Sequence, residues 1–244
     1  MSPAAPSENR EQRRTEIVGA ALRLLEEKGL DRLSLRGEAR ELGMHAPGLY
    51  WYIANRQELI DLLAKAILDE AVADLAAPAP GQGWDDWLID FALRMRQALL
   101  AHRDGARVVA GAFLFRTNSI TGFLELALET LEAEGFSRDF AMLGAVTVMR
   151  YTLGIALDDQ ESPTREPEVR KRMLEQAMAK GPPIDAERWP RVADVMSRWF
   201  EKVKDTRTAG DHTGMHFRHG LGLVIEGIRS TLGKEIGSAS RSQQ

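Results

Sequence analysis

The chain has 244 residues, of which 44% are hydrophobic and 28% are charged, and its formal net charge is −4. This composition is typical of a soluble globular protein and argues against intrinsic disorder and against a generally basic, histone-like DNA binder. The absence of Cys excludes a disulfide scaffold, a thiolate nucleophile and a Cys-based zinc site, and it is compatible with a reducing, cytoplasmic environment.

The start of the chain predicts a disordered arm followed by a helix. Residues 1–12 are rich in Pro, Ala, Ser, Glu and Arg and have no periodic apolar positions, so we expect neither order nor a secretory signal there. Apolar residues then recur at helical spacing from Ile17 to Leu25, and Gly29 stands where a helix C-cap would.

Three shorter segments with helix signals follow. Ser34 is a candidate N-cap for a short helix that Gly43 ends, and Pro47 suits the first turn of another short helix. Asn55 is a candidate cap for a longer helix, with Glu58 at the third helical position of a capping box.

Helical patterns and breaks fill the rest of the chain. The segment Pro78–Gly83 is the first clear break, and apolar residues follow helical spacing again from Trp84 to Leu99. Further helices are predicted over residues 104–115, 120–134, 137–157, 167–180, 186–204 and 212–233. Because there is no alternating strand pattern and no fixed repeat, we predict an all-α fold of about nine or ten helices. No apolar run approaches the roughly 20 residues of a membrane helix, so we expect no membrane partner.

The two short helices around Leu42-Gly43-Met44 have the sequence form of a helix-turn-helix. The second helix of such a pair must be slim enough to enter a major groove about 12 Å wide. The residues from His45 to Gly48 are small enough, and Tyr50-Trp51-Tyr52 supplies hydroxyl and ring N–H donors beside them. Similar helix pairs occur in all-α proteins that bind no DNA, so the pattern alone leaves ordinary packing open.

The string LSLRGEARELGMHAPGLYWYIANRQELIDLLA, from Leu33 to Ala64, resembles the DNA-binding domain of the TetR family of bacterial transcriptional regulators. In that family an aromatic-rich recognition helix ends in a Tyr-aromatic-aromatic triplet, and a basic residue precedes the next long helix. Tyr50-Trp51-Tyr52 and Asn55-Arg56 fill those places. Residues 102–111, 132–139, 151–162 and 217–228 are also similar to the tetracycline-repressor subfamily, so the resemblance spans most of the chain.

The resemblance implies a ligand-responsive regulator, acting as a repressor, that binds a palindromic double-stranded DNA operator as a homodimer. The implied domains are a helix-turn-helix domain at 13–58 and an effector-binding and dimerisation domain at 59–235, with a disordered tail at 236–244. The implied DNA-binding residues are Ser34, Arg36, His45, Ala46, Pro47, Gly48, Tyr50, Trp51, Tyr52 and Arg56. Ala46 and Gly48 replace larger polar residues of the subfamily. We therefore expect few side chains to contact bases directly, and we expect Arg36 to make much of any specific contact.

The implied ligand-binding positions are mostly apolar in this chain: Val72, Phe91, Met95, Val109, Phe113, Phe123, Met149 and Asp158. The subfamily holds a tetracycline–magnesium chelate there, with histidines at the places of Val72 and Val109. Val, Phe and Met cannot hold a metal, and only Asp158 keeps an acidic group. We therefore expect no metal cofactor and a small hydrophobic or aromatic effector, although the same residues could also fill a collapsed core without a pocket.

The helices predicted over residues 137–157 and 212–233 combine apolar residues with interior glycines. Each interior glycine lowers helix stability by about 1 kcal/mol relative to Ala. Glycines kept at that cost favour close backbone approach, and in the family these helices form a four-helix dimer interface. The implied interface residues are Gly144, Tyr151, Gly154, Phe217, Gly220, Leu221, Val224 and Ile228. Ordinary packing within one chain is the alternative.

Three other functions remain open from the sequence. His212, His216 and His219 share one helix face and could make the protein a metal-responsive regulator, although three imidazoles without a nearby carboxylate or Cys are a weak signal. An enzyme is the second alternative, but the chain has no nucleophile elbow, no phosphate loop and no His-Glu-x-x-His motif. A protein-interaction module without DNA affinity is the third, because basic and acidic residues balance over residues 1–60.

Overall fold

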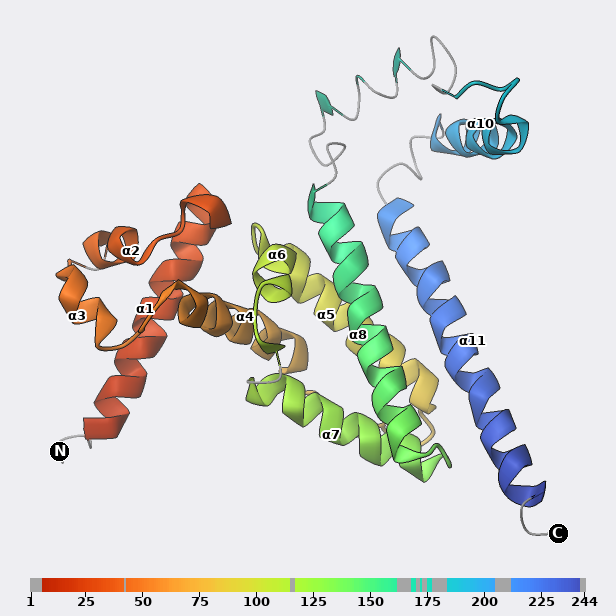
Figure 1. Ribbon diagram of the computed structural model, residues 1–244, viewed down its shortest axis with the longest axis horizontal. Helices are drawn as coiled ribbons and strands as arrows, with labels where there is room; N and C mark the ends of the chain where they lie inside the picture. The colour runs from red at the N-terminus through yellow and green to blue at the C-terminus, as the bar shows by residue number, and fades with distance from the viewer. Residues whose placement is uncertain are drawn as a thin grey trace. The chain divides into compact units, whose positions relative to one another are not determined.

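The computed structural model describes residues 6–41, 43–114, 117–161, 168–169, 172, 175–176, 184–204 and 212–241. Every regular element in these ranges is helical, which confirms the all-α prediction for the described part of the chain (Figure 1). The α-helices are α1 (Pro6–Lys28), α2 (Leu35–Glu41), α3 (Ala46–Tyr50), α4 (Arg56–Val72), α5 (Trp84–Ala101), α6 (Gly105–Ala110), α7 (Asn118–Ala133), α8 (Arg138–Glu161), α10 (Pro190–Lys204) and α11 (His212–Arg241), and a 3-10 turn, η1, covers Leu30–Arg32.

Both ends of the chain are more helical than predicted. Helix α1 begins at Pro6, so residues 6–12 belong to a helix rather than to a disordered arm. Pro is compatible with a first helical turn, and the Glu and Arg residues that suggested an arm are also good helix formers. At the other end α11 continues to Arg241, beyond the predicted start of a disordered tail at 236.

The helix boundaries of the N-terminal part follow the predicted caps. Ser34 Oγ accepts a bond of 3.2 Å from the N–H of Gly37, and Asn55 Oδ1 accepts one of 2.9 Å from the N–H of Glu58. The Glu58 carboxylate accepts in turn from the N–H of Ala54 at 2.7 Å, which completes a capping box one residue before the cap. These bonds satisfy N–H groups that the helix itself leaves without a partner.

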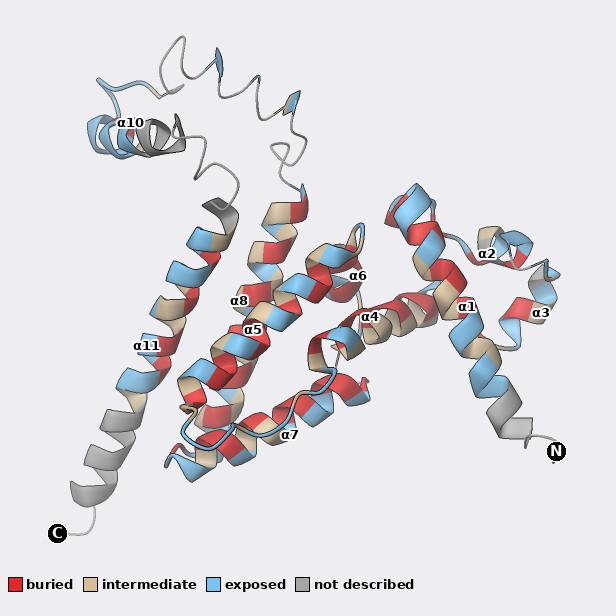
Figure 2. Ribbon diagram, turned by 180° about the vertical axis from the view of Figure 1, so that it is seen from behind, coloured by how far each residue is buried: buried red, intermediate tan, exposed pale blue. Residues whose placement is uncertain are grey.

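The chain forms two compact units, residues 1–157 with 223–244 and residues 158–222. Within the first unit we call α1, η1, α2 and α3 the head and α5 to α8 the body. Helix α4 packs on α1 and also on α5, α6 and α7, so it joins the head to the body (Figure 1). Its buried stripe continues the core from one to the other (Figure 2), through Leu59, Ile60, Leu63, Ala64, Ile67, Leu68 and Ala71.

Aromatic side chains fill the middle of the body. The rings of Phe91 and Phe123 stack at 3.4 Å between centroids and 9° between planes, and Trp87 stacks on Phe123 at 5.9 Å. Trp84 meets Phe136 edge-on at 5.3 Å. Burying each such side chain contributes about 1.5–3 kcal/mol, so these contacts fix α5 against α7.

Helix α8 is the one described helix long and apolar enough, by length and composition alone, to cross a membrane. One side of this helix is buried in the fold. A Cβ placed on Gly144 would meet Ile228 of α11 at 3.5 Å, which is ordinary van der Waals contact. Ala141, Ala145 and Val148 are fully buried on the same helix. Gly144 therefore lies within contact reach of Ile228 of α11 inside one chain.

The second unit is described mainly through α10 and the start of α11. Asp185 Oδ1 accepts from the N–H groups of Glu187 and Arg188 at 3.1 and 3.0 Å, and this turn leads into α10 at Pro190. The helix predicted from 186 thus starts four residues later, after the turn. The helix predicted over 167–180 lies largely outside the described residues.

Candidate nucleic-acid interface and effector core

The predicted helix-turn-helix is formed by α2 and α3. Gly43 adopts φ 63°, a left-handed conformation that most side chains disfavour, and it reverses the chain between the two helices. The N–H of Met44 bonds the carbonyl of Ala39 at 2.8 Å and so closes the turn. Leu49 and Ile53 are fully buried, which anchors the short α3 on the rest of the head.

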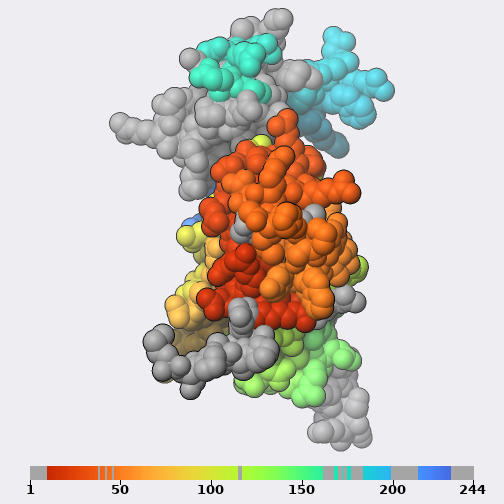
Figure 3. Space-filling view, turned by 90° about the vertical axis from the view of Figure 1, so that its left-hand side faces the viewer, coloured from red at the N-terminus to blue at the C-terminus, as the bar shows by residue number. Residues whose placement is uncertain are grey.

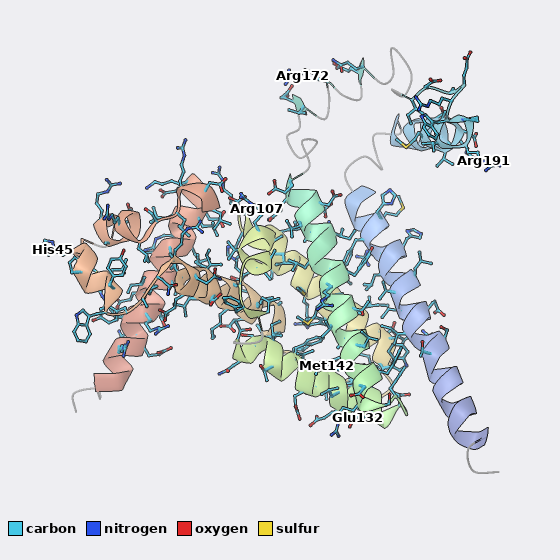
Figure 4. The ribbon with its side chains drawn as sticks, in the orientation of Figure 1. His45, Arg107, Glu132, Met142, Arg172 and Arg191 are labelled. Carbon is cyan, nitrogen blue, oxygen red and sulfur yellow. The ribbon has the colours of Figure 1, made fainter. Side chains whose placement is uncertain are left out.

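The predicted DNA-binding residues lie mainly on the outside of this motif. Ser34, Arg36, His45, Pro47 and Arg56 are exposed, while Gly48 and Tyr52 are half-buried. Tyr50 is 49% exposed and Trp51 is 79% exposed. The side chain of Ala46 is outside the described side chains. Figure 4 shows His45 at the outer edge of the head, and Figure 3 looks directly onto this face, where α2 and α3 are orange.

A shallow hollow of about 430 Å³ opens on the same face. It is lined by Ser34, Leu35, Arg36, Tyr50, Ala54, Asn55 and Arg56. Two guanidinium groups, a phenol and a hydroxyl are donors that suit the oxygens of a phosphate backbone. Arg56 Nη2 also donates to the carbonyl of Leu30 at 3.1 Å. This bond positions the side chain, which remains exposed.

The predicted ligand positions divide between the core and the surface. Phe91, Met95, Val109, Phe123 and Met149 are buried in the body. Val72 is half-buried, whereas Phe113 is 57% exposed and Asp158 is exposed. Phe113 lies on the surface, three residues after the end of α6 at Ala110.

The predicted dimer residues are largely used within the chain. Gly144, Phe217, Leu221 and Ile228 are buried within the single chain. Tyr151, Gly220 and Val224 are half-buried and Gly154 is exposed; burial raises the pKa of the Tyr151 hydroxyl. The dimer interface drawn from the apolar residues and glycines of these two helices stays a prediction, because burial within one chain does not test a contact with a second copy.

The outer faces of α8 and α11 carry exposed apolar residues that the sequence reasoning missed. Leu143 is 55% exposed on α8, and Leu223 is 77% exposed on α11. A Cβ placed on Gly154, Gly222 or Gly227 would have open space around it. We call this set the outer α8–α11 face.

Helix α6 is held at its start by the head. Arg103 donates to the carbonyls of Glu26 and Glu27 at 3.3 and 3.1 Å, at the end of α1. Asp104, in a left-handed conformation with φ 57°, accepts from the N–H of Leu30 at 2.8 Å. Gly29 permits this approach, because a Cβ there would lie 2.9 Å from the Asp104 carboxylate.

Further contacts hold the rest of α6. Arg107, labelled in Figure 4, pairs with Asp31 of η1 at 2.9 Å, and this guanidinium lowers the pKa of the Asp31 carboxyl. Beyond the helix, Gln57 of α4 donates to the carbonyl of Gly111 at 2.8 Å. Asp61 of α4 accepts from the N–H of Phe113 at 3.0 Å. We call the contacts at both ends of α6 the α6 clasp.

The histidine cluster gains no support from the described residues, among which no group of three or more possible metal ligands comes together. His219 Nδ1 lies 2.8 Å from the carbonyl of Met215. His216 is exposed, and the side chain of His212 lies outside the described side chains.

Sequence profiles of two protein families match the chain. The profile described as "Bacterial regulatory proteins, tetR family" matches residues 17–63, and "Tetracyclin repressor-like, C-terminal domain" matches residues 77–232. The class D tetracycline repressor of Escherichia coli is 37% identical over 148 residues, which are 61% of this chain and 66% of that protein. The class C repressor of Escherichia coli is 30% identical over 218 residues, 88% of this chain and 90% of that protein.

Solved structures agree with the sequence matches. A possible TetR family regulator from Streptomyces coelicolor A3(2) superposes with a TM-score of 0.71 at 28% identity, covering 89% of this chain and 99% of that one. A TetR variant of Acinetobacter baumannii AYE in complex with minocycline gives a TM-score of 0.63 at 28% identity, covering 89% of this chain and 96% of that one. BioQ with its double-stranded DNA operator gives a TM-score of 0.55 at 30% identity, covering 68% of this chain and 98% of that one. The chain therefore belongs to the TetR family of ligand-responsive, DNA-binding transcriptional regulators.

Proposed function

We propose that this regulator is a repressor that binds a palindromic operator as a homodimer and is released by a small hydrophobic or aromatic ligand. The observation that carries the proposal is the α6 clasp. Val108 and Val109 of α6 are fully buried in the body, while the contacts on either side of them belong to the head and to α4. A ligand that displaces Val109 must therefore move α6 and strain its bonds to the head.

DNA binding is assigned to the exposed side of α2 and α3. Arg36 and Arg56 flank the hollow on this face and suit the phosphate backbone, while the small residues of α3 let it approach the base edges. In a twofold-symmetric dimer two such helices reach successive major grooves about 34–36 Å apart. The BioQ structure with its operator DNA supports this use of a related fold.

The ligand is assigned to the interior of the body, around Phe91, Met95, Val109 and Phe123. Their fully buried apolar side chains favour a flat, apolar ligand. The related protein from Acinetobacter baumannii is in complex with minocycline, which supports a ligand role for this domain. The residues of this chain do not fit a magnesium chelate, because Val72 and Val109 have no atom that binds a metal.

The homodimer is assigned to the outer α8–α11 face. Leu143 and Leu223 expose apolar surface there, and Gly154, Gly222 and Gly227 leave room for a second backbone. Exposed apolar residues on a helix pair are typical of a contact that a second copy covers. As a DNA-binding repressor of this kind, the protein would act in the cytoplasm and would have no catalytic step.

The test begins with selection of duplexes from a random-sequence library by the purified protein. We expect a palindromic consensus, a solution mass of two chains, and release of the selected duplex by apolar polycyclic aromatics but not by tetracycline with magnesium. Release requires the ligand to distinguish two states by about 1–3 kcal/mol, which is a 5- to 150-fold change in affinity. A monomer that enriches no sequence would refute the proposal, and release by micromolar tetracycline with magnesium would refute the assignment of the ligand.

A further inference from the structure

The start of α1 carries three arginines, and two of them are neutralised by ion pairs. Arg13 pairs with a glutamate of α1, and Arg14 pairs with a glutamate of α4 at 2.8 Å. Arg10 differs, because its Nη2 donates to the main-chain carbonyl of Trp51 at 3.2 Å. Among the described side chains no carboxylate pairs with Arg10, and Arg10 is exposed.

This bond fixes Arg10 beside the end of the candidate recognition helix. It connects residues 41 positions apart and lies next to Tyr50 and Trp51, which expose 49% and 79% of their surface. In Figure 3 red side chains of α1 lie on the same face as the orange side chains of α2 and α3. The next carboxylate, Glu11, lies about 100° further round the helix.

The chemistry of the guanidinium suits a second partner. Arg has five N–H donors in a planar fork, and the bond to Trp51 uses one of its terminal nitrogens. The remaining donors can bind phosphate oxygens, which pair well with a guanidinium. Because residues 6–12 are helical, Arg10 is carried on a rigid element at a constant distance from α3.

We propose that Arg10 binds a DNA phosphate adjacent to the end of α3, so that the start of α1 forms part of the DNA interface. The inference rests on the proposed operator binding by α2 and α3, and it adds a contact outside the helix-turn-helix itself. The competing role is purely structural, in which Arg10 only holds the end of α3 in place.

The two roles differ in their dependence on salt. Each phosphate contact that is lost reduces the slope of log affinity against log salt concentration by about 0.9. For a dimer, Arg10→Ala should therefore weaken binding of the selected duplex about tenfold or more at 0.15 M salt and reduce the slope by about 1.8. Arg10→Lys should keep most of the slope. Arg23→Ala, an exposed arginine on the same helix beyond the interface, is the control and should change neither quantity.

A second measurement locates the phosphate. Uncharged methylphosphonates are placed one at a time along each strand of the selected duplex. One position per half-site should weaken the wild type and leave Arg10→Ala unaffected. Weaker binding by Arg10→Ala with an unchanged slope, or no phosphate specific to Arg10, would overturn the inference while leaving the proposed function in place. Failure of the wild type to select any duplex would overturn both.

Discussion

Trp51 in the head is 79% exposed, whereas Phe91 in the body is fully buried against Phe123. Trp51 directly follows α3 and Phe91 lies on α5, and only Phe91 contributes apolar burial to folding. An exposed Trp adds little to the free energy of unfolding, so its value lies in what it touches in a complex. The head therefore exposes aromatic residues that are available to contact DNA, whereas the body buries them in its own core, where we propose that a small ligand binds.

The largest expected effect sharpens this contrast. Phe91→Ala removes a ring that stacks on Phe123 and should lower the free energy of unfolding by about 3–5 kcal/mol, as measured by urea titration. Trp51→Ala is the matched control and should change the same quantity by less than about 0.5 kcal/mol while weakening DNA binding. A cost for Phe91→Ala below about 1 kcal/mol would contradict a tightly packed core at this position.

The α6 clasp connects the two regions, and the next prediction tests that connection. Arg103→Ala removes the bonds to the carbonyls of Glu26 and Glu27 and should abolish most of the 5- to 150-fold change in DNA affinity that a bound ligand causes. DNA affinity without ligand should remain within about threefold, as measured by fluorescence anisotropy.

Arg94→Ala provides a close control for the clasp. Arg94 is also exposed and also donates to a main-chain carbonyl, that of Ala73 at 3.1 Å, but it lies on α5 and away from the head. This variant should respond to ligand as the wild type does. If both variants retained the full ligand response, α6 would not transmit it through the clasp.

The sequence predicts the head better than the connection between head and body, for a physical reason. Ser34 and Asn55 bond to N–H groups three residues away, so the chemistry of each cap is contained in a short string. The clasp joins residues 52 to 77 positions apart, and its contact with Leu30 depends on a left-handed Asp104 that no local rule requires. Nothing in the string from His102 to Gly105 shows that its partners are the end of α1 and η1.

The effector core was only partly predictable, again because burial depends on distant packing. Of three phenylalanines predicted as ligand positions, Phe91 and Phe123 are buried, whereas Phe113 is exposed after the end of α6. The glycines of α8 and α11 predicted a dimer contact, which stays a prediction. Gly144 and Ile228 meet within one chain, however, so periodicity alone could not identify the outer face.

A smaller effect is expected at the junction of the two regions. Asn55→Ala removes the cap of α4 and should lower the free energy of unfolding by about 1 kcal/mol, because the N–H of Glu58 loses its partner. Asn55→Ser keeps a capping oxygen and should recover most of that loss. Chemical denaturation of both variants measures the difference, and equal values for Ala and Ser would mean that the cap contributes nothing.

The smallest effect concerns the pH dependence of the clasp. Arg107 lowers the pKa of Asp31 below its ordinary value of 3.8, so the charged form of Asp31 is favoured in the folded state. A lowered folded-state pKa stabilises the protein above pH 3.8 and loses that contribution as the pH falls through the folded value. The stability difference between wild type and Asp31→Asn should therefore be constant near neutral pH and shrink below pH 3.8.

The pair is solvent-exposed on the Asp31 side, so its whole contribution is small and should also fade at high salt. A double-mutant cycle with Arg107→Ala separates the pair from other effects, because Asp31→Asn should cost nothing further once Arg107 is absent. A pH-independent difference that persists in the Arg107→Ala background would show that Asp31 stabilises η1 by its own backbone contacts. In that case the connection of α6 to the head would rest on other contacts, among them those of Asp104 and Arg103.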